Sequence, residues 1–235
     1  MADPDEAVAT NRLIACLPRK DQRQVYAEAK QVELTAGDVL CEAGAPIKHV
    51  YFPLTGYISL VATIADHFGL EVSLIGNEGM FGVPVALGVG CSLQQALVQG
   101  TGLALRLEAA ALRRLMRSSR ALQQRLSHYA HVQTSQFAQV AACTRFHPIG
   151  ERLARSLLMT HDRAHADQFD VTQQFLANML SVRREGVSAA AGLLRARKLI
   201  RYSGGRITIL NRAGLESAAC GCYGASVQTY DQVMQ

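Results

Sequence analysis

The chain changes character after residue 108, and this change limits the possible folds more than any other feature. Before it, short runs of β-branched and aromatic residues alternate with glycine and proline, which is typical of an antiparallel sandwich or barrel. From Ala109 to Phe146 there is no glycine or proline, and good helix formers dominate. The sequence predicts an N-terminal helical segment over 1–30, a β-barrel or jelly roll over 31–108 and one long helix over 109–146.

The predicted long helix carries a stripe of apolar residues and glutamines. Its members form two rows that recur every seven residues and are offset by four, the spacing of a two-helix contact. One alternative is that the helix packs on its own barrel. Because the stripe is long and contains glutamines, a partner helix from a second subunit is favoured. The predicted dimer seam consists of Leu115, Leu122, Leu126, Tyr129, Gln133, Gln136 and Val140.

The excess positive charge is confined to one segment. The chain has a net charge of +5, whereas residues 145–212 hold 12 lysine and arginine residues against five acidic ones. Residues 1–144 hold 12 of each sign. A compact basic segment is what a module that neutralises phosphates requires, although a merely basic surface would have the same composition.

Two short helices and a hairpin are expected inside this basic segment. Thr172 is a suitable N-cap for the helix TQQFLANML, and a tight turn at Ser181-Val182 leads to a second, basic helix. The runs KLIRY and RITIL then flank Ser203-Gly204-Gly205, which has hairpin-turn chemistry. The residues expected to face the core from the second helix are Val187, Ala190, Leu193 and Leu194. The sequence therefore predicts a winged helix-turn-helix over 147–212, followed by a C-terminal helix and tail over 213–235.

The start of the second helix carries the candidate base-reading residues, because this end of a recognition helix enters the major groove. A guanidinium can make two hydrogen bonds to guanine, and a carboxylate can accept one from cytosine. Glu185 is the most informative, since an anion beside DNA lowers affinity unless it meets a donor. A solvated ion-pair face is the alternative. The base-reading candidates are Arg183, Arg184, Glu185 and Ser188. The phosphate-contacting candidates are Thr172, Gln173, Arg195, Arg197, Lys198, Arg201 and Arg206.

The stretch VTQQFLANMLSVRREGVSAAAGLLRARKLIRYSGGRITI resembles the DNA-binding motif of the Crp/Fnr family of bacterial transcription regulators. The segments VYFPLTGYISLVATI and LEVSLIGNEGMFGVP are similar to that family's sensor domain. The resemblance implies a homodimer on a near-palindromic DNA site, with RNA polymerase as a partner if the protein is an activator. It also implies that Arg184 and Glu185 are the family's base-reading pair. Two positions depart from the family pattern: Ala189 replaces a frequent arginine, and Ser181 replaces a frequent glycine.

The effector of the β-rich domain is not evident from the sequence. Residues 79–105, which match the family's nucleotide-binding region, contain no charged residue or histidine. This disfavours a cyclic nucleotide as the ligand, because a phosphate that is buried without a cation loses its hydration and gains no ion pair in return. The alternatives left open are an apolar ligand and no ligand. The histidines considered as haem ligands, and interpreted as surface or capping residues, are His49, His67 and His128.

The cysteines give no motif for a bound group. Cys16, Cys41, Cys91 and Cys143 are too dispersed to indicate an iron–sulfur cluster. The Cys220-Gly221-Cys222 pair is a candidate redox or metal site, with free buried thiols as the favoured interpretation. A redox switch through Cys143 or through Cys220 and Cys222 is an alternative that would be compatible with a transcription regulator. The sequence predicts no cofactor and no metal.

The sequence favours a cytoplasmic transcription regulator. No targeting signal, phosphate loop, nucleophile elbow or metal-spacing motif is recognisable, so no enzymatic activity is expected. The rival hypothesis is a module that senses a small molecule, either a cyclic nucleotide or an apolar ligand, and whose basic domain binds a protein partner.

Overall fold

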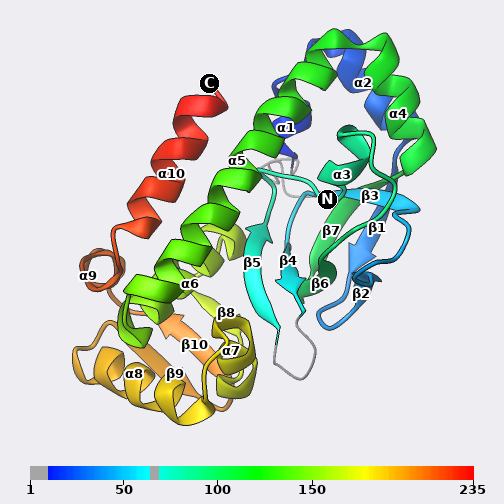
Figure 1. The fold of residues 1–235 in the computed structure, drawn as a ribbon. Helices are drawn as coiled ribbons and strands as arrows, with labels where there is room; N and C mark the ends of the chain where they lie inside the picture. The colour runs from blue at the N-terminus through cyan, green and yellow to red at the C-terminus, as the bar shows by residue number, and fades with distance from the viewer. Residues whose placement is uncertain (1–9, 64–68) are drawn as a thin grey trace, which may run out of the picture.

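The computed structural model describes residues 10–63 and 69–235. It places a β-rich unit and a small C-terminal unit along one long helix, with the C-terminal helix beside that helix (Figure 1). Residues 1–9 of the predicted N-terminal segment and His67 lie outside the described residues. Within the described ranges, no helix is both long enough and apolar enough to span a bilayer.

Two helices precede the sheets, α1 (Arg12–Ala15) and α2 (Arg19–Glu28). Asn11 caps α1 by accepting a hydrogen bond from Leu13 N at 3.1 Å, and its side chain is fully buried. Its amide nitrogen donates to the carbonyl oxygens of Pro53 at 3.0 Å and Gly79 at 2.8 Å. One asparagine side chain therefore attaches the N-terminal helices to two distant segments of the β-rich unit.

The β-rich unit contains two antiparallel sheets, which confirms the predicted jelly roll as two separate sheets rather than a closed barrel. The three-stranded sheet has the order β1 (Lys30–Leu34), β7 (Gly102–Glu108), β3 (His49–Pro53). The four-stranded sheet has the order β2 (Val39–Cys41), β6 (Gln95–Gly100), β4 (Tyr57–Ala62), β5 (Leu70–Ile75). The short helix α3 (Val83–Ala86) joins β5 to β6. Apolar side chains from both sheets and from the helices beside them share one core.

The predicted single helix over 109–146 is two helices, α4 (Ala109–Ser118) and α5 (Arg120–Phe146). Ser119 interrupts it with extended backbone angles, and its hydroxyl accepts a hydrogen bond from Leu122 N at 3.0 Å. Serine competes with helix continuation by this type of local bond. The lack of glycine and proline in the sequence was therefore insufficient to predict one uninterrupted helix.

The structure contradicts the prediction that the seven residues of the dimer seam form the contact with a second subunit. All seven residues are between 1% and 7% exposed without any second subunit. They are covered by the chain itself, because α5 packs on β5, α3 and α10 (Cys222–Val233), and α4, which carries Leu115, packs on α2 and α3. Gln136, for example, accepts a hydrogen bond from Ser73 on β5 at 3.0 Å. A heptad pattern reports which face is buried and does not identify what buries it.

The C-terminal unit is the predicted winged helix-turn-helix, with one added strand. Its elements are α6 (Ile149–Ala164), β8 (Gln168–Asp170), α7 (Gln173–Leu180), α8 (Arg184–Ala196), β9 (Ile200–Ser203) and β10 (Arg206–Ile209). The hairpin of β9 and β10 turns at Gly204-Gly205, both with positive φ, as a tight hairpin turn requires. The added strand is β8, which precedes Thr172 and pairs with β10.

The core of this unit is apolar and separate from that of the β-rich unit. Val187, Ala190 and Leu194 face it from α8, as predicted, but Leu193 is 68% exposed. Leu193 is next to the buried Leu194 in the chain but lies outside the buried stripe of α8. Adjacent leucines on a helix point about 100° apart, so only one of them faces the core.

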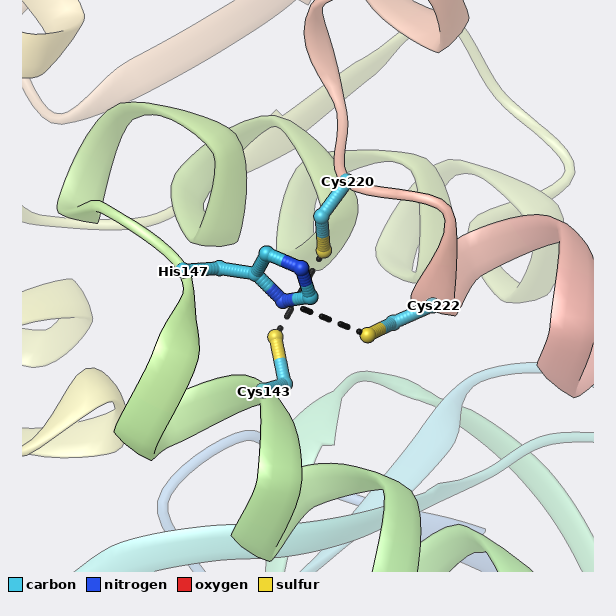
Figure 2. Close-up of side chains that lie close together, drawn as sticks. All are labelled: Cys143, His147, Cys220 and Cys222. Carbon is cyan, nitrogen blue, oxygen red and sulfur yellow. Dashed lines mark hydrogen bonds between the residues drawn. The ribbon is translucent and has the colours of Figure 1, made fainter.

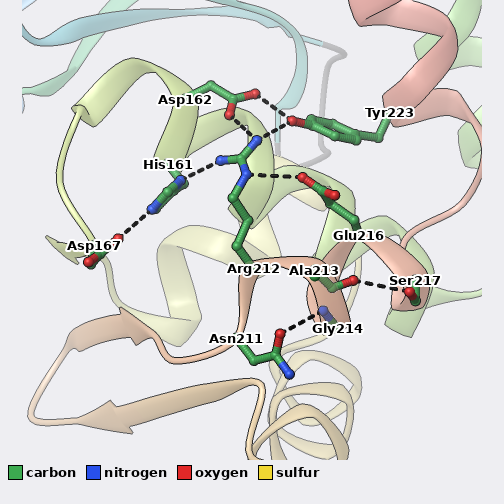
Figure 3. Close-up of polar contacts among 10 residues, drawn as sticks. All are labelled: His161, Asp162, Asp167, Asn211, Arg212, Ala213, Gly214, Glu216, Ser217 and Tyr223. Carbon is green, nitrogen blue, oxygen red and sulfur yellow. Dashed lines mark hydrogen bonds and ion pairs between the residues drawn. The ribbon is translucent and has the colours of Figure 1, made fainter.

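The C-terminal segment forms two helices, α9 (Arg212–Ala218) and α10. A polar network around Arg212 joins them to α6 (Figure 3): its guanidinium contacts Asp162 at 2.7 Å, Glu216 at 3.0 Å and the Tyr223 hydroxyl at 2.6 Å. At the other end of α10, the Tyr230 hydroxyl donates to the carbonyl of Glu78 at 2.8 Å. The helix therefore contacts both units of the chain.

Candidate nucleic-acid interface

The two helices of the motif are joined by a turn with defined cap geometry. Thr172 caps α7, as predicted, and its hydroxyl accepts a hydrogen bond from Phe175 N at 3.1 Å. Ser181 ends α7 in the left-handed conformation, with φ of 51°, and its N–H bonds back into the helix. Arg183 then occupies the N-cap position of α8 without a side-chain cap bond. A guanidinium has only donors and cannot cap the N–H groups of a helix N-terminus, so the side chain of Arg183 does not satisfy this end of α8.

Ser181 occupies a position where glycine is the favoured residue. A left-handed residue with a Cβ costs about 1–2 kcal/mol, partly offset by the larger entropy of glycine in the unfolded chain. We expect Ser181→Gly to raise the free energy of unfolding by about 0.5–1 kcal/mol, measured by chemical denaturation. The matched control is Ser217→Gly at an exposed helical position of α9, which should instead lower it by about 0.5–1 kcal/mol. A loss for both variants would contradict the argument.

The predicted base-reading residues lie together at the first turn of α8. Arg183, Arg184 and Glu185 are all exposed. Ser188 is half-buried, and its hydroxyl donates to Gln173 Oε1 at 2.6 Å. The Gln173 N–H in turn donates to the Tyr202 hydroxyl at 3.0 Å. Ser188 and Gln173 thus connect the two helices in this structure.

The predicted phosphate-contacting cations surround the other end of α8 and the wing. Arg195, Arg197, Lys198, Arg201 and Arg206 are all exposed. Arg206 is paired with Asp170 across the β8–β10 ladder, with Nε and Oδ1 at 2.8 Å. An exposed pair of this kind contributes little to stability, so its guanidinium can exchange the carboxylate for a phosphate.

Comparison with known proteins agrees with this geometry. Residues 151–218 match the model of the Crp-like helix-turn-helix domain, and residues 31–119 match that of the cyclic nucleotide-binding domain. The chain belongs to the Crp/Fnr family of transcription regulators. No relative of this Crp/Fnr chain was found among curated protein sequences.

Solved structures share the fold of this Crp/Fnr regulator. FixK2 from Bradyrhizobium japonicum has a TM-score of 0.70 at 16% identity, over 82% of this chain and 98% of that one. A CRP/FNR-family transcriptional regulator from Thermus thermophilus has a TM-score of 0.67 at 22% identity, over 81% and 98%. The c-di-GMP responsive regulator CLP from Xanthomonas campestris has a TM-score of 0.67 at 15% identity, over 82% and 99%.

The uncharged segment of the sensor domain forms part of the apolar interior of this Crp/Fnr regulator. Met80, Phe81, Val83 and Val85 lie in and before α3 and are buried in the core of the β-rich unit. The backbone of Gly82 at the start of α3 has a φ of 110°. The match to the cyclic nucleotide-binding domain therefore describes the fold of this unit. The segment over 79–105 supplies no cationic side chain that could bind a phosphate.

A cavity of about 290 Å³ lies between the β-rich unit, α6 and α10. Charged side chains from both units of the regulator line it, among them Arg12, Glu78, Asp162 and Arg212. A fifth, Arg163, is paired with Glu78 at 2.7 Å. The sequence analysis did not single out this cavity, because its walls come from segments far apart in the chain.

The structure also brings together four side chains that the sequence analysis did not group. The thiols of Cys143, Cys220 and Cys222 and the imidazole of His147 have one ligand atom each within 4.8 Å of all the others (Figure 2). The three thiols are buried and His147 is half-buried. The hydrogen bond from Cys220 and the charge of Arg155 lower the pKa of the Cys143 thiol.

This cluster changes the interpretation of the cysteines in the Crp/Fnr regulator. The prediction of no metal rested on Cys220 and Cys222 as an isolated pair and on Cys143 as one of a dispersed set or a separate redox candidate. The sequence signal for such a cluster is weak. Cys143 and His147 are four residues apart, and the Cys-x-Cys pair begins 77 residues after Cys143. Only the return of the C-terminal segment along α5 places these residues together.

Proposed function

We propose that the protein is a sequence-specific transcription regulator that binds a near-palindromic DNA site as a homodimer. The observation that carries the proposal is the first turn of α8. Arg183, Arg184 and Glu185 are exposed there, and none of them takes part in an ion pair with another residue in the described parts of the chain. Their hydrogen-bonding groups are available to base edges.

Helix electrostatics support a role in binding for the two arginines. Cations at a helix N-terminus are unfavourable by a few tenths of a kcal/mol up to about 1 kcal/mol, whereas an acid is favourable there. Two adjacent arginines at this end of α8 therefore do not stabilise the helix. A negatively charged partner that meets this end of the helix accounts for both of them, and Glu185 adds a requirement for a donor on the base edge.

The homodimer requires a surface other than the predicted seam, because that seam is inside the chain. The outward face of α5 presents exposed residues at three- and four-residue spacing: Gln124, Ser127, His131, Thr134, Ala138 and Ala141. Such residues share one side of a helix. We place the contact with the second copy on this side, which would align two α8 helices with two half-sites.

The β-rich unit would then modulate DNA binding. In this proposal an effector changes the relative populations of two arrangements of the units, one of which fits the DNA spacing. The c-di-GMP responsiveness named for CLP is one precedent among proteins of this fold. The cavity lined by both units is the place where a small polar effector would contact both.

The experiment is selection of binding sites from a randomised duplex pool with purified protein at two salt concentrations. The expected result is a near-palindrome whose half-sites are about one helical turn apart. Retention of DNA without any consensus, equally weakened by salt for all sequences, would overturn the specific reader and leave a domain that binds only phosphates.

Glu185→Ala is expected to relax the preference at one base pair of each half-site. The discrimination lost should be about 1–3 kcal/mol, because one directed hydrogen bond to a base edge disappears. Binding to random DNA should be unchanged or stronger, since a negative charge has been removed from the interface. The measurement is a repeat of the selection together with direct titrations of matched and mismatched sites. An unchanged consensus would remove Glu185 from the base-reading set.

A further inference from the structure

We propose that Cys143, His147, Cys220 and Cys222 form a binding site for one divalent metal ion of the zinc type. The site is distinct from the DNA-reading surface on α8, and the proposal does not depend on what that surface binds. Three thiolates and one imidazole are a donor set of structural zinc sites. The metal site considered for Cys220 and Cys222 thus gains Cys143 and His147 as two further ligands.

The distances fit a single tetrahedral ion. The Sγ atoms of Cys143 and Cys220 are 3.5 Å apart, and His147 Nδ1 is 3.4 Å from Cys222 Sγ. In a tetrahedron with zinc–sulfur bonds of about 2.3 Å and zinc–nitrogen bonds of about 2.0–2.1 Å, ligand atoms are separated by roughly 3.6–3.8 Å. Small rotations of the side chains would therefore suffice. A four-iron cluster spreads its ligands over several irons and needs a wider set.

Two of the ligands come from the end of α5 and the other two from the start of α10 (Figure 2). Cys143 is in the last turn of α5, and His147 is the residue that ends this helix, one turn later. Cys220 precedes α10 and Cys222 is its first residue, so Gly221 separates two ligands at the start of a helix. Gln139, one turn before Cys143, donates from Nε2 to Cys222 Sγ at 2.9 Å. Such a bond to a ligand atom is typical of the residues that orient metal ligands.

The charge of the surroundings suits an occupied site. Three thiolates and one divalent cation leave a net charge of −1. Arg155 is 8% exposed, and its Nε and Nη2 atoms have no hydrogen-bond partner in the described part of the chain. A buried cation of this kind needs a compensating negative charge. Arg155 lines one small cavity together with Cys143, so the negative charge of an occupied site would lie beside it.

The first test is the metal content of the full chain, purified under reducing conditions, with elemental analysis of zinc per protein. We expect about one zinc per chain, and loss of it in Cys143→Ser and Cys222→Ser. The matched control is Cys41→Ser, which removes another buried thiol outside the cluster and should leave the zinc unchanged. Zinc that is absent from the wild type after supplementation, or retained in both cluster variants, would overturn the proposal.

A second measurement does not depend on whether those variants fold. Cobalt(II) added to the wild-type apoprotein should give the intense absorption of a tetrahedral thiolate site, saturating at one ion per chain. Gln139→Ala keeps all four ligands and should weaken cobalt binding about 10- to 100-fold, since an orienting hydrogen bond is lost. Weak octahedral-type absorption would overturn the assignment. A Cys143–Cys220 disulfide, found by mass spectrometry of protein purified under the same reducing conditions, would overturn it in favour of a redox pair.

Discussion

Replacing Asn11 with alanine is expected to lower the free energy of unfolding by about 2–4 kcal/mol. The fully buried amide donates to two carbonyls in the β-rich unit, those of Pro53 and Gly79, while its oxygen caps α1. The variant removes a cap and deprives two carbonyls of a donor where water cannot replace it. Chemical denaturation of the full chain, followed by a signal from the β-rich unit, measures the loss.

Asn211→Ala is the matched control for this variant. Asn211 is also the N-cap of a helix and accepts a hydrogen bond from Gly214 N at 2.8 Å, but it is exposed. Its replacement should remove only the helix cap and lower the free energy of unfolding by about 0.5–2 kcal/mol. If the two variants cost the same, the bridging bonds of Asn11 would contribute nothing beyond a normal cap.

Arg184→Ala is expected to weaken binding about 5- to 150-fold for each half-site of the selected DNA, which corresponds to about 1–3 kcal/mol for one bidentate base contact. The homodimer loses one such contact in each half-site, so the two losses add in free energy. Arg184 is the first helical residue of α8 and is exposed. Its removal should leave stability unchanged or slightly raised, because a cation leaves a helix N-terminus. Titrations at fixed salt with the selected and with random DNA, alongside thermal unfolding, separate the two effects.

Arg206→Ala supplies the contrast on the wing. This variant should weaken binding to the selected and to random DNA by the same factor. It should also reduce the salt dependence of binding, as the loss of a phosphate contact does. If Arg184→Ala also weakened both DNAs equally, Arg184 would be a phosphate contact and the base-reading role would be withdrawn.

Local patterns predicted the elements well wherever a short segment determines its own structure. Thr172, the turn at Ser181-Val182 and the Gly204-Gly205 hairpin each act on residues within a few positions, and the structure has all three. Ser119 shows the limit of composition, since one side-chain cap divided a segment of good helix formers.

Contacts between distant segments were the part that the sequence could not specify. The stripe on α5 was correctly identified as buried, yet its cover is the chain itself. Cys143 and Cys220 meet across 77 residues, and no local spacing encodes such a meeting. The base-reading roles on α8 remain predictions, because exposure alone does not identify what a side chain binds.

The position of α10 has a consequence for how the protein is made. Both units precede this helix in the chain, and domains generally fold as units in the order of synthesis. The buried residues of both apolar cores come earlier in the chain than this helix. The contacts of this helix are added last, when Tyr230 reaches the carbonyl of Glu78 and Tyr223 reaches Arg212, next to the Arg163–Glu78 pair that already joins the two units. A chain that stops before Gly221 would keep the Arg163–Glu78 ion pair between its two units but would lack the hydrogen bond from Tyr230 to the β-rich unit.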